Sequence, residues 1–330
     1  MNKALIPVWL LLATSSPALA QAQAAAPQAA PFQATSGPAA SLVDKTTQTE
    51  DVRFRNEYNY RMTVPVKLSG NGPYRFLVDT GADRTAISRD LATRLKLRAG
   101  EGVSLHSISG VSSVDTATVP ELQLTRKPVR IADAPLLESV NMGADGILGT
   151  DSLASQRVVF DFSAQTMSIV PSASPDWHDE PGTIVVEARR RNGRLVVTDA
   201  YANGQHITVV LDTGSQISIG NEALRTMLTA RSLSGSQPVE LESVTGDKLA
   251  GDYMFVKEVE VGGIGLRNLA VVFAPAHTFK QLKLDKKPAL LLGMNAIRSF
   301  KKVSIDFARK TLRVIVPQES RLEVQTASLL

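Results

Sequence analysis

The 330-residue chain contains no cysteine. Disulfide bonds, thiol nucleophiles, a lipid-anchoring cysteine and cysteine-ligated metals are therefore excluded, and the folded chain must be stabilised by its core. Apolar residues make up 43% of the sequence, which is enough for a sizeable core and argues against wholesale disorder. No metal or other cofactor is expected, because the four histidines lack the spacing of metal ligands. They are His106, His178, His206 and His277.

Hydrophobic runs long enough to span a bilayer are also missing, so no stable membrane anchor is expected. A short apolar stretch at residues 4–13 follows Lys3 and precedes Ala18-Leu19-Ala20, the small-x-small pattern of a cleavage site. Residues 1–20 are thus predicted to be a signal peptide that directs export to the periplasm or the medium. Residues 21–51, rich in Ala, Pro, Gln and Ser, are predicted to be a flexible leader.

Charge of one sign is in slight excess only, with a formal net charge of +4. Basic residues cluster briefly at 189–191 and 301–302, without the broad basic face and interleaved aromatics of a nucleic-acid binder, so no nucleic-acid partner is expected. Gly262-Gly263-Ile264-Gly265 lacks the nucleotide-binding pattern and is predicted to be a turn between strands. A G-x-S-x-G elbow, the mark of many serine hydrolases, is absent.

After the leader, the same series of motifs occurs twice. In each copy an apolar run ends in Asp-Thr-Gly, an apolar-apolar-Gly motif follows, and a late strand pattern with a further aspartate closes the copy. The matching motifs are Asp79-Thr80-Gly81 and Asp212-Thr213-Gly214, Ile147-Leu148-Gly149 and Leu291-Leu292-Gly293, and Val159-Phe160-Asp161-Phe162 and Ser304-Ile305-Asp306-Phe307. Two large copies indicate a duplicated lobe rather than a solenoid. Lobes are predicted at 52–171 and 183–317, with a linker at 172–182 and a tail at 318–330.

Each copy has mainly the patterns of β-strands. Residues 61–68 and 195–202 are expected to be strands, followed by hairpin turns at Asn71-Gly72 and Asn203-Gly204. Residues 89–97 are expected to form a short helix. Residues 103–119 and 239–255 alternate about the central pairs Ser109-Gly110 and Thr245-Gly246, which predicts two hairpins. The expected fold is all-β with two barrel-like lobes and a few short helices.

The paired Asp-Thr-Gly motifs suggest that Asp79 and Asp212 lie face to face. Two carboxylates about 3 Å apart cannot both ionise, so they share one proton and offer an acid and a base together. A water between them can lose a proton to the charged carboxylate and attack an amide carbonyl, while the neutral one donates to the developing oxyanion. Such a site requires no metal, serine or cysteine.

The neighbouring residues have roles that fit this chemistry. Gly81 and Gly214 allow the sharp turn that brings N–H groups to each carboxylate. Thr80 and Thr213 carry hydroxyls that can bond across to the other loop. A hydroxyl donated by Ser215 to Asp212 would favour the charge on Asp212 and the proton on Asp79. The hairpin tips at Ser109, Gly110, Thr245 and Gly246 are predicted to fold over a bound peptide as flaps.

With these motifs the sequence resembles aspartic proteases of the retropepsin and pepsin group. Residues 79–83, D-T-G-A-D, are similar to the retroviral form, and residues 212–215, D-T-G-S, to the pepsin form. The resemblance spans roughly residues 56–317, and with the signal peptide the chain looks similar to bacterial periplasmic members with two fused retropepsin-like lobes. It implies a bilobal acid-protease fold, Asp79 and Asp212 as the catalytic pair, and endopeptidase activity on extended peptide or protein substrates.

The chain departs from this pattern at the residue after the second glycine motif. Retroviral enzymes have an Arg there that pairs with the acid after D-T-G-A, whereas Thr150 and Met294 occupy the place here. Asp83 therefore lacks that partner, and the contact between lobes must be made differently. Neither hairpin tip has the tyrosine of pepsin flaps, and the presence of two flap-like hairpins favours a fused retropepsin pair.

Three alternatives stand beside the protease hypothesis. The late aspartates Asp161 and Asp306 also repeat, but no Thr-Gly follows them, so a structural role is expected. The competing function class is a non-catalytic module, a duplicated acid-protease fold kept for peptide binding. The intact Asp-Thr-Gly in both copies argues against it, because loss of one acid would be the simplest way to silence such a site. Each lobe could also pair with a second chain, but the fused repeat makes a monomer sufficient.

Overall fold

The computed structural model describes residues 50–53, 55–56, 62–124, 128–174, 182–228 and 233–316. The predicted signal peptide and tail, nearly all of the predicted leader, and most of the predicted linker lie outside these residues. Among the residues that are described, no helix combines the length and hydrophobicity needed to cross a membrane. The chain is mostly strand, with six helices of four to six residues in the described part, so the all-β prediction is confirmed.

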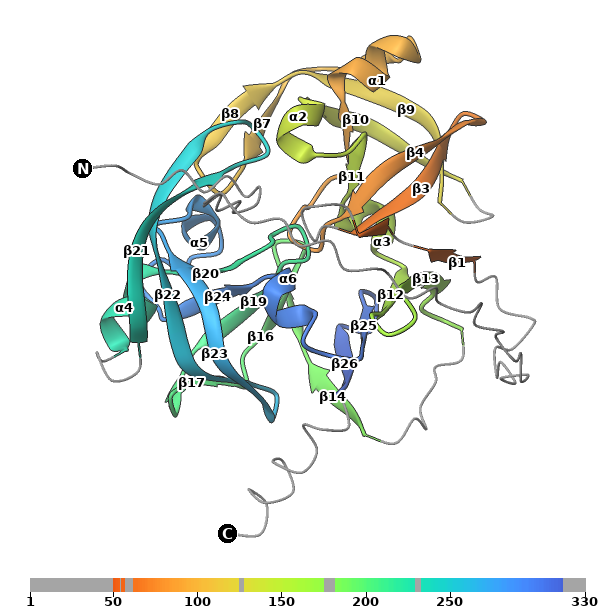
Figure 1. Cartoon of the computed structure of the whole chain (residues 1–330). Coiled ribbons are helices and arrows are strands. Elements are labelled where there is room, and N and C mark those ends of the chain that lie inside the picture. The colour runs from red at the N-terminus through yellow and green to blue at the C-terminus, as the bar shows by residue number, and fades with distance from the viewer. Residues whose placement is uncertain are drawn as a thin grey trace, which may run out of the picture.

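The first lobe is built on an eight-stranded sheet (Figure 1). Its order is β2 (Arg55–Asn56), β3 (Met62–Leu68), β4 (Asn71–Val78), β11 (Gly146–Leu148), β5 (Ala86–Ser88), β10 (Val129–Leu137), β9 (Thr116–Gln123) and β6 (Arg98–Ala99). A further pairing of β3 with β9 curls the sheet back on itself. Strand β4 runs parallel to β11, and Phe76, Leu77 and Val78 at its end are all buried.

The second lobe repeats this arrangement in a ten-stranded sheet. Its order is β15 (Arg189–Arg191), β16 (Arg194–Val197), β19 (Thr208–Leu211), β24 (Ala289–Leu292), β20 (Ser218–Gly220), β23 (Ile264–Phe273), β22 (Lys248–Val261), β17 (Ala200–Ala202) and β18 (Gln205–His206), with β21 (Leu233–Glu242) paired to β22. The series β3-β4-β11-β5-β10-β9 thus matches β16-β19-β24-β20-β23-β22. Strand β19 is parallel to β24 as β4 is to β11, which confirms the duplication.

A third, six-stranded antiparallel sheet joins the two lobes. Its order is β1 (Glu50–Arg53), β13 (Thr166–Pro171), β12 (Gln156–Asp161), β25 (Lys302–Asp306), β26 (Thr311–Ile315) and β14 (Thr183–Glu187). The late strands of the two copies, β12 and β25, pair with each other at its centre. Asp161 accepts bonds from Ser163 and Ala164 in a turn, and Asp306 accepts bonds from Ser172 and Arg309. Both late aspartates therefore have the structural role expected of them.

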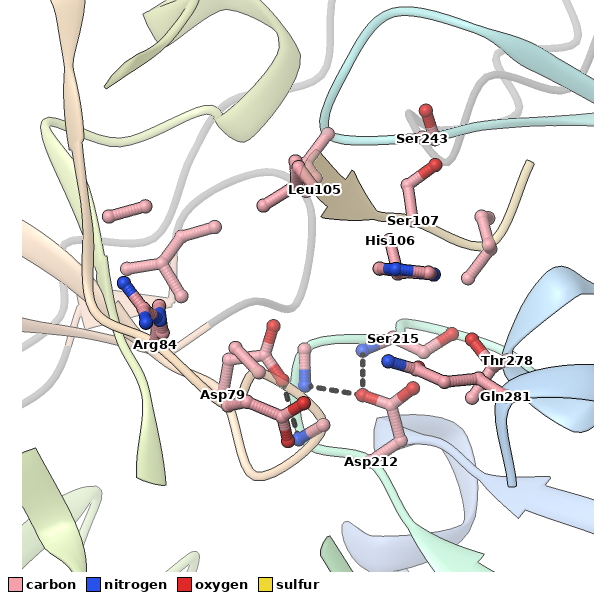
Figure 2. Close-up of a pocket in the computed structure, with 18 of the residues that line it drawn as sticks. Asp79, Arg84, Leu105, His106, Ser107, Asp212, Ser215, Ser243, Thr278 and Gln281 are labelled. Atoms are coloured by element: carbon pink, nitrogen blue, oxygen red, sulfur yellow. Dashed lines mark hydrogen bonds between the residues drawn. The ribbon is translucent and has the colours of Figure 1, made fainter. Parts of the chain in front are cut away.

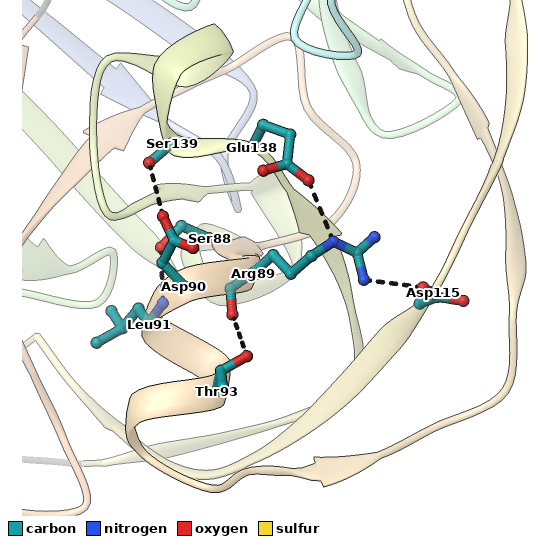
Figure 3. A network of polar contacts seen from close by, with 8 residues as sticks. All are labelled: Ser88, Arg89, Asp90, Leu91, Thr93, Asp115, Glu138 and Ser139. Carbon is teal, nitrogen blue, oxygen red and sulfur yellow. Dashed lines mark hydrogen bonds and ion pairs between the residues drawn. The ribbon is translucent and has the colours of Figure 1, made fainter.

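The short helices connect strands at matching places in the two lobes. They are α1 (Arg89–Arg94), α2 (Ser139–Met142), α3 (Thr150–Leu153), α4 (Glu222–Met227), α5 (His277–Gln281) and α6 (Met294–Ile297). Helix α1 begins where the Ser88 hydroxyl accepts the N–H of Leu91, and α4 where Asn221 caps Leu224 in the same way. Arg89 ties α1 to Asp115 and Glu138 (Figure 3). The predicted helix over 89–97 is correct at its start but ends earlier, since Lys96 has a positive φ of 51°.

Two hairpin predictions need correction. The turn after β3 lies at Ser69 and Gly70, whose φ values of 48° and 80° suit a tight hairpin turn, and Asn71 already pairs with Leu68 in the strand. The predicted strand over 195–202 is divided into β16 and β17, which pair with different neighbours. The turn at Asn203-Gly204 and the turn at Gly262-Gly263 are confirmed, with positive φ at all four residues.

Both predicted flap-like hairpins are present. Strands β7 (Val103–His106) and β8 (Val111–Val114) form the first, and the facing ends of β21 and β22 form the second. We call residues 103–114 the first flap and residues 239–251 the second flap. In Figure 1 the end of the β21–β22 hairpin extends toward β7 and β8, so the two flaps approach each other above the junction of the lobes.

Candidate active site

Each Asp-Thr-Gly loop is delivered by the end of a buried parallel strand. The N–H of Asp79 bonds to the carbonyl of Leu148 in β11 (3.1 Å), and the N–H of Asp212 bonds to that of Leu292 in β24 (3.1 Å). The ladder thereby continues up to the acid itself and fixes its backbone. An apolar run ending in a carboxylate follows from this geometry, because the strand is covered on both faces until the sheet ends at the junction between lobes.

Thr80 and Thr213 lock the two loops together. The N–H of Thr80 donates to the Thr213 hydroxyl (3.0 Å), and the N–H of Thr213 donates to the Thr80 hydroxyl (3.0 Å). Each hydroxyl in turn donates to a carbonyl of the opposite strand, Thr80 to Leu211 (3.0 Å) and Thr213 to Val78 (2.7 Å). Both side chains are buried. Four reciprocal bonds thus join segments 131 to 135 residues apart in sequence, as the hydroxyls were expected to do.

The glycines bring the two carboxylates close to each other. Gly81 packs against the Asp212 carboxyl, since an added Cβ would lie 2.7 Å from Asp212 Oδ1. Gly214 packs in the same way against Asp79, where an added Cβ would collide with the whole carboxyl group. Each acid therefore lies over the glycine of the opposite loop. Any larger residue at either position would push the carboxylates apart.

Backbone N–H groups of the loops donate to both acids (Figure 2). Gly81 donates to Asp79 Oδ1 (2.7 Å), and Gly214 and Ser215 both donate to Asp212 Oδ1 (3.1 Å each). The expected bond from the Ser215 hydroxyl to Asp212 is not formed, because that hydroxyl donates to the Ile217 carbonyl instead (2.7 Å). The prediction of a bond from the Ser215 hydroxyl was therefore wrong. Ser215 donates to Asp212 with its backbone N–H instead.

A second set of side chains supports the loops from below, and no sequence motif pointed to it. In the first lobe Asp151 accepts the N–H (2.9 Å) and hydroxyl (2.7 Å) of Thr85. In the second lobe Asn295 accepts the N–H and hydroxyl of Ser218 (2.8 Å each). Asp151 and Asn295 follow the residues that replace the retroviral Arg, so this place supports the loop of its own lobe.

The glycines of the apolar-apolar-Gly motifs have the role predicted for them. An added Cβ at Gly149 would lie 2.6 Å from the carbonyl oxygen of Arg84, and one at Gly293 would lie 2.6 Å from that of Ile217. Backbone carbonyls have little room to move, so a side chain does not fit under either loop.

A cavity of about 310 Å³ lies above the two acids and takes its walls from both lobes. Asp79, Gly81, Asp212, Gly214 and Ser215 form its floor, and the flaps face them from the other side in Figure 2. The flap residues that line the cavity are residues 103–108 of the first flap and residues 241–244 of the second, including Leu105, His106, Ser107, Ile108, Ser243 and Val244. The predicted flap residues Ser109, Gly110, Thr245 and Gly246 do not line it, because the cavity is lined by the residues just before each tip.

Each flap reaches across to the opposite lobe. In the first flap, Ile108 packs against the apolar cluster of the second lobe and its carbonyl accepts the N–H of His277 in α5 (2.8 Å). In the second flap, Val244 packs against the apolar cluster of the first lobe, and an added Cβ at Gly246 would lie 2.9 Å from Asn141 in α2. The Ser112 hydroxyl contacts Asp247 (3.4 Å), which links one flap to the other.

The first flap has an additional contact that sequence reasoning missed. His106 Nδ1 lies 2.9 Å from His277 Nε2, and the two rings stack with centroids 5.2 Å apart. Burial and the positive charges of His106 and Lys280 lower the pKa of His277. A neutral ring is required to accept this hydrogen bond, so the contact depends on the protonation of the pair.

Arg194 makes the contact between lobes near Asp83. The retroviral Arg that would pair with this acid is missing, so a different contact between the lobes was expected. Arg194 is buried, and its guanidinium donates to the carbonyl of Gly81 (2.6 Å) and to Gln281 (2.9 Å). Burial raises the pKa of Asp83, although the charges of Arg194 and Arg190 lower it in part. Asp83 Oδ1 is buried without a hydrogen-bond partner in the described part of the chain.

Two β lobes that each supply one Asp-Thr-Gly loop to a shared cavity define the bilobal acid-protease class. The profile of the aspartyl protease family matches residues 64–152 and 198–296, one region in each lobe. The chain therefore belongs to the aspartyl protease family, and the double match agrees with two fused retropepsin-like lobes. A search of curated proteins returns no match. No group of three or more potential metal-ligating side chains occurs among the described residues.

Proposed function

We propose that the protein is an exported aspartic endopeptidase, which hydrolyses peptide bonds with a water activated between Asp79 and Asp212. The observation that carries this proposal is the interlocking of the two Asp-Thr-Gly loops. Cross-bonded threonines and glycines packed on opposite carboxyls hold both acids at the floor of one cavity. A lobe kept only for binding has no need of this paired arrangement.

In the proposed reaction the charged acid takes a proton from the water as it attacks the scissile carbonyl. The neutral acid donates its proton to the carbonyl oxygen, which gives a gem-diol. The acid that took the water proton then donates it to the amine nitrogen, the other acid takes a proton from a gem-diol hydroxyl, and the C–N bond breaks to release the amine and a carboxylic acid. We assign the charge to Asp212, because two N–H groups donate to its Oδ1 and favour the ionised form. Asp79 then carries the proton.

The cavity suits an extended peptide. Its floor comes from both lobes, and apolar residues line it on either side of the acids, including Leu137 and Ile147 in the first lobe and Val210 and Leu291 in the second. The flaps close it from above, so a bound peptide would be screened from water at the scissile bond. Both acids come from one chain, so we propose a monomer that needs no cofactor. Export rests on the predicted signal peptide, and trimming of residues 1–20 in the secreted protein would test it.

The second candidate is a non-catalytic module that binds extended peptides in the same cavity. The two are separated by incubating the full chain with a peptide library and identifying products by mass spectrometry, with a statine-type inhibitor as a control. Internal cleavage that disappears in Asp79→Asn and persists in Asp161→Asn, which alters a structural acid, supports the protease. Peptide binding without cleavage at any pH from 3 to 8 would favour the module.

A further inference from the structure

The third residue after the first Asp-Thr-Gly differs sharply in character from its counterpart after the second. Arg84 and Ile217 occupy equivalent places: each directly precedes the hydroxyl residue held by Asp151 or Asn295, and each has its carbonyl against a motif glycine. Ile217 packs against the apolar cluster of the second lobe. Arg84, in contrast, is exposed and lines the cavity, on the Asp79 side in Figure 2.

The charge of Arg84 is not paired with an acid among the described residues. Its guanidinium forms no hydrogen bond or ion pair with any residue that the structure describes, whereas nearby Asp151 is bonded to Thr85 and Ser152. Burial raises the pKa of Asp83, its neighbour in the chain, and Arg190 and Arg194 place positive charge near it. This end of the cavity therefore presents a cation that has no ion-pair partner among the described residues.

We propose that Arg84 is a specificity-determining residue that recognises an acidic side chain of the substrate on one side of the scissile bond. Its counterpart in the second lobe, Ile217, packs into the apolar cluster and does not line the cavity, so the acidic preference is confined to the first-lobe half. A guanidinium donates two parallel bonds to a carboxylate, which distinguishes Glu or Asp from their amides as well as from apolar residues. This inference rests on the proposed peptidase function for its choice of substrate.

Cleavage profiles of a peptide library test the proposal. We expect the wild-type chain to prefer Asp or Glu over Asn or Gln roughly fivefold at one position, as for a partly exposed ion pair. Arg84→Gln should abolish this preference, Arg84→Lys should retain part of it, and Arg84→Glu should replace it by a preference for Lys or Arg. Arg94→Gln, which removes an exposed charge of α1 outside the cavity, should leave the profile unchanged. A profile that Arg84→Gln leaves intact would overturn the assignment.

A binding measurement separates this inference from the proposed function. Fluorescence anisotropy of two labelled peptides that differ only by Glu or Gln is measured with Asp79→Asn protein, with and without Arg84→Gln. If the wild type cleaves nothing, yet Asp79→Asn binds the Glu peptide more tightly and only when Arg84 is present, the protease fails and the recognition role stands. Cleavage combined with equal binding of both peptides refutes the recognition role alone.

Discussion

The two lobes are alike where they hold the acids and different where they face the cavity. Each has the same strand order, the same Thr bond across the junction, and the same glycine beneath the loop. After the motif, however, Ala82, Asp83 and Arg84 in the first lobe stand against Ser215, Gln216 and Ile217 in the second. The frame of the acid pair requires both halves to match, whereas the cavity wall does not. Arg84 lines the cavity in the first lobe, while its counterpart Ile217 packs into the second lobe's apolar cluster instead.

The flaps show the same contrast. Both insert an apolar residue into the opposite lobe, Ile108 in one case and Val244 in the other. Only the first flap has, within the described residues, a histidine pair that bonds it to the helix opposite. Matched substitutions in the two lobes can therefore distinguish the effect of the duplicated loops that hold the acids from the effect of contacts present in one lobe alone.

The largest effect is expected from the glycines that contact the acids. Gly81→Ala and Gly214→Ala each place a Cβ against the opposite carboxyl, so the acid pair must move apart. Displacement of about 1 Å costs on the order of 100-fold in rate, and we expect at least that loss of peptide cleavage from each variant. Gly265→Ala, at a position with no atom near the added Cβ, serves as the control. Near-normal activity in either loop variant would show that the close packing is not needed.

Replacement of the cross-bonded threonines should lower stability equally in the two lobes. Thr80→Val or Thr213→Val removes a hydroxyl that both donates and accepts, leaving a buried N–H and a buried carbonyl of the opposite strand unpaired. We expect each variant to lose about 3 kcal/mol of unfolding free energy, measured by denaturant titration. If the losses of unfolding free energy in the two variants differ by more than about 1 kcal/mol, the two threonines do not contribute equally, contrary to their matching hydrogen bonds.

Asp83→Asn should stabilise the fold near neutral pH, because it removes a partly buried charge whose Oδ1 has no hydrogen-bond partner among the described residues. The pKa of Asp83 is raised in the folded state, so its contribution to stability is fully present below pH 3.8 and is lost as pH rises through the folded pKa. We expect a gain of about 1 kcal/mol at pH 7 and a flatter dependence of stability on pH. The measurement is urea unfolding from pH 3.5 to 7.5. A loss of stability at pH 7 would show that the fold needs the charge of Asp83.

A smaller, local effect is expected at the first flap. The pKa of His277 is lowered in the folded state. Neutral His277 therefore stabilises its contact with His106 above pH 6.5, and this stabilisation is lost as the pH falls through the folded pKa. The charged groups around the pair are Lys280 on α5 and Asp83 in the loop below. Hydrogen exchange, corrected for intrinsic rates, should increase with acidification in residues 105–110 and 277 but not in residues 243–247. His106→Asn, which preserves a bonding atom without titrating, should remove the difference. Equal responses of both flaps would contradict this account.

Much of the structure around the acid pair was predictable, because it is formed by short sequence segments that occur in both lobes. The paired Asp-Thr-Gly motifs at Asp79 and Asp212, the two glycine motifs and the two hairpins each follow from local pattern. Because the chain is duplicated, each of these patterns occurs twice, and together they predict the aspartyl protease family that the profile match shows.

The contacts between distant segments were not predictable. His106 and His277 are 171 residues apart, Asp151 lies 66 residues from Thr85, and Arg194 lies 113 residues from Gly81. No local pattern marks a side chain whose partner is brought to it only by the fold. The Ser215 hydroxyl illustrates the same limit at short range, since Ile217 and Asp212 offer competing acceptors and only the loop geometry decides between them.

The central claim is that Asp79 and Asp212 act as one unit. The most direct test is the kcat/KM of peptide cleavage for Asp79→Asn, for Asp212→Asn and for the variant with both changes. Residues that act together are strongly non-additive, so each single change should lower kcat/KM by about 1,000-fold or more, and the double change should lower it little further. A single variant that retains a tenth of the activity, or losses that multiply in the double variant, would contradict the account.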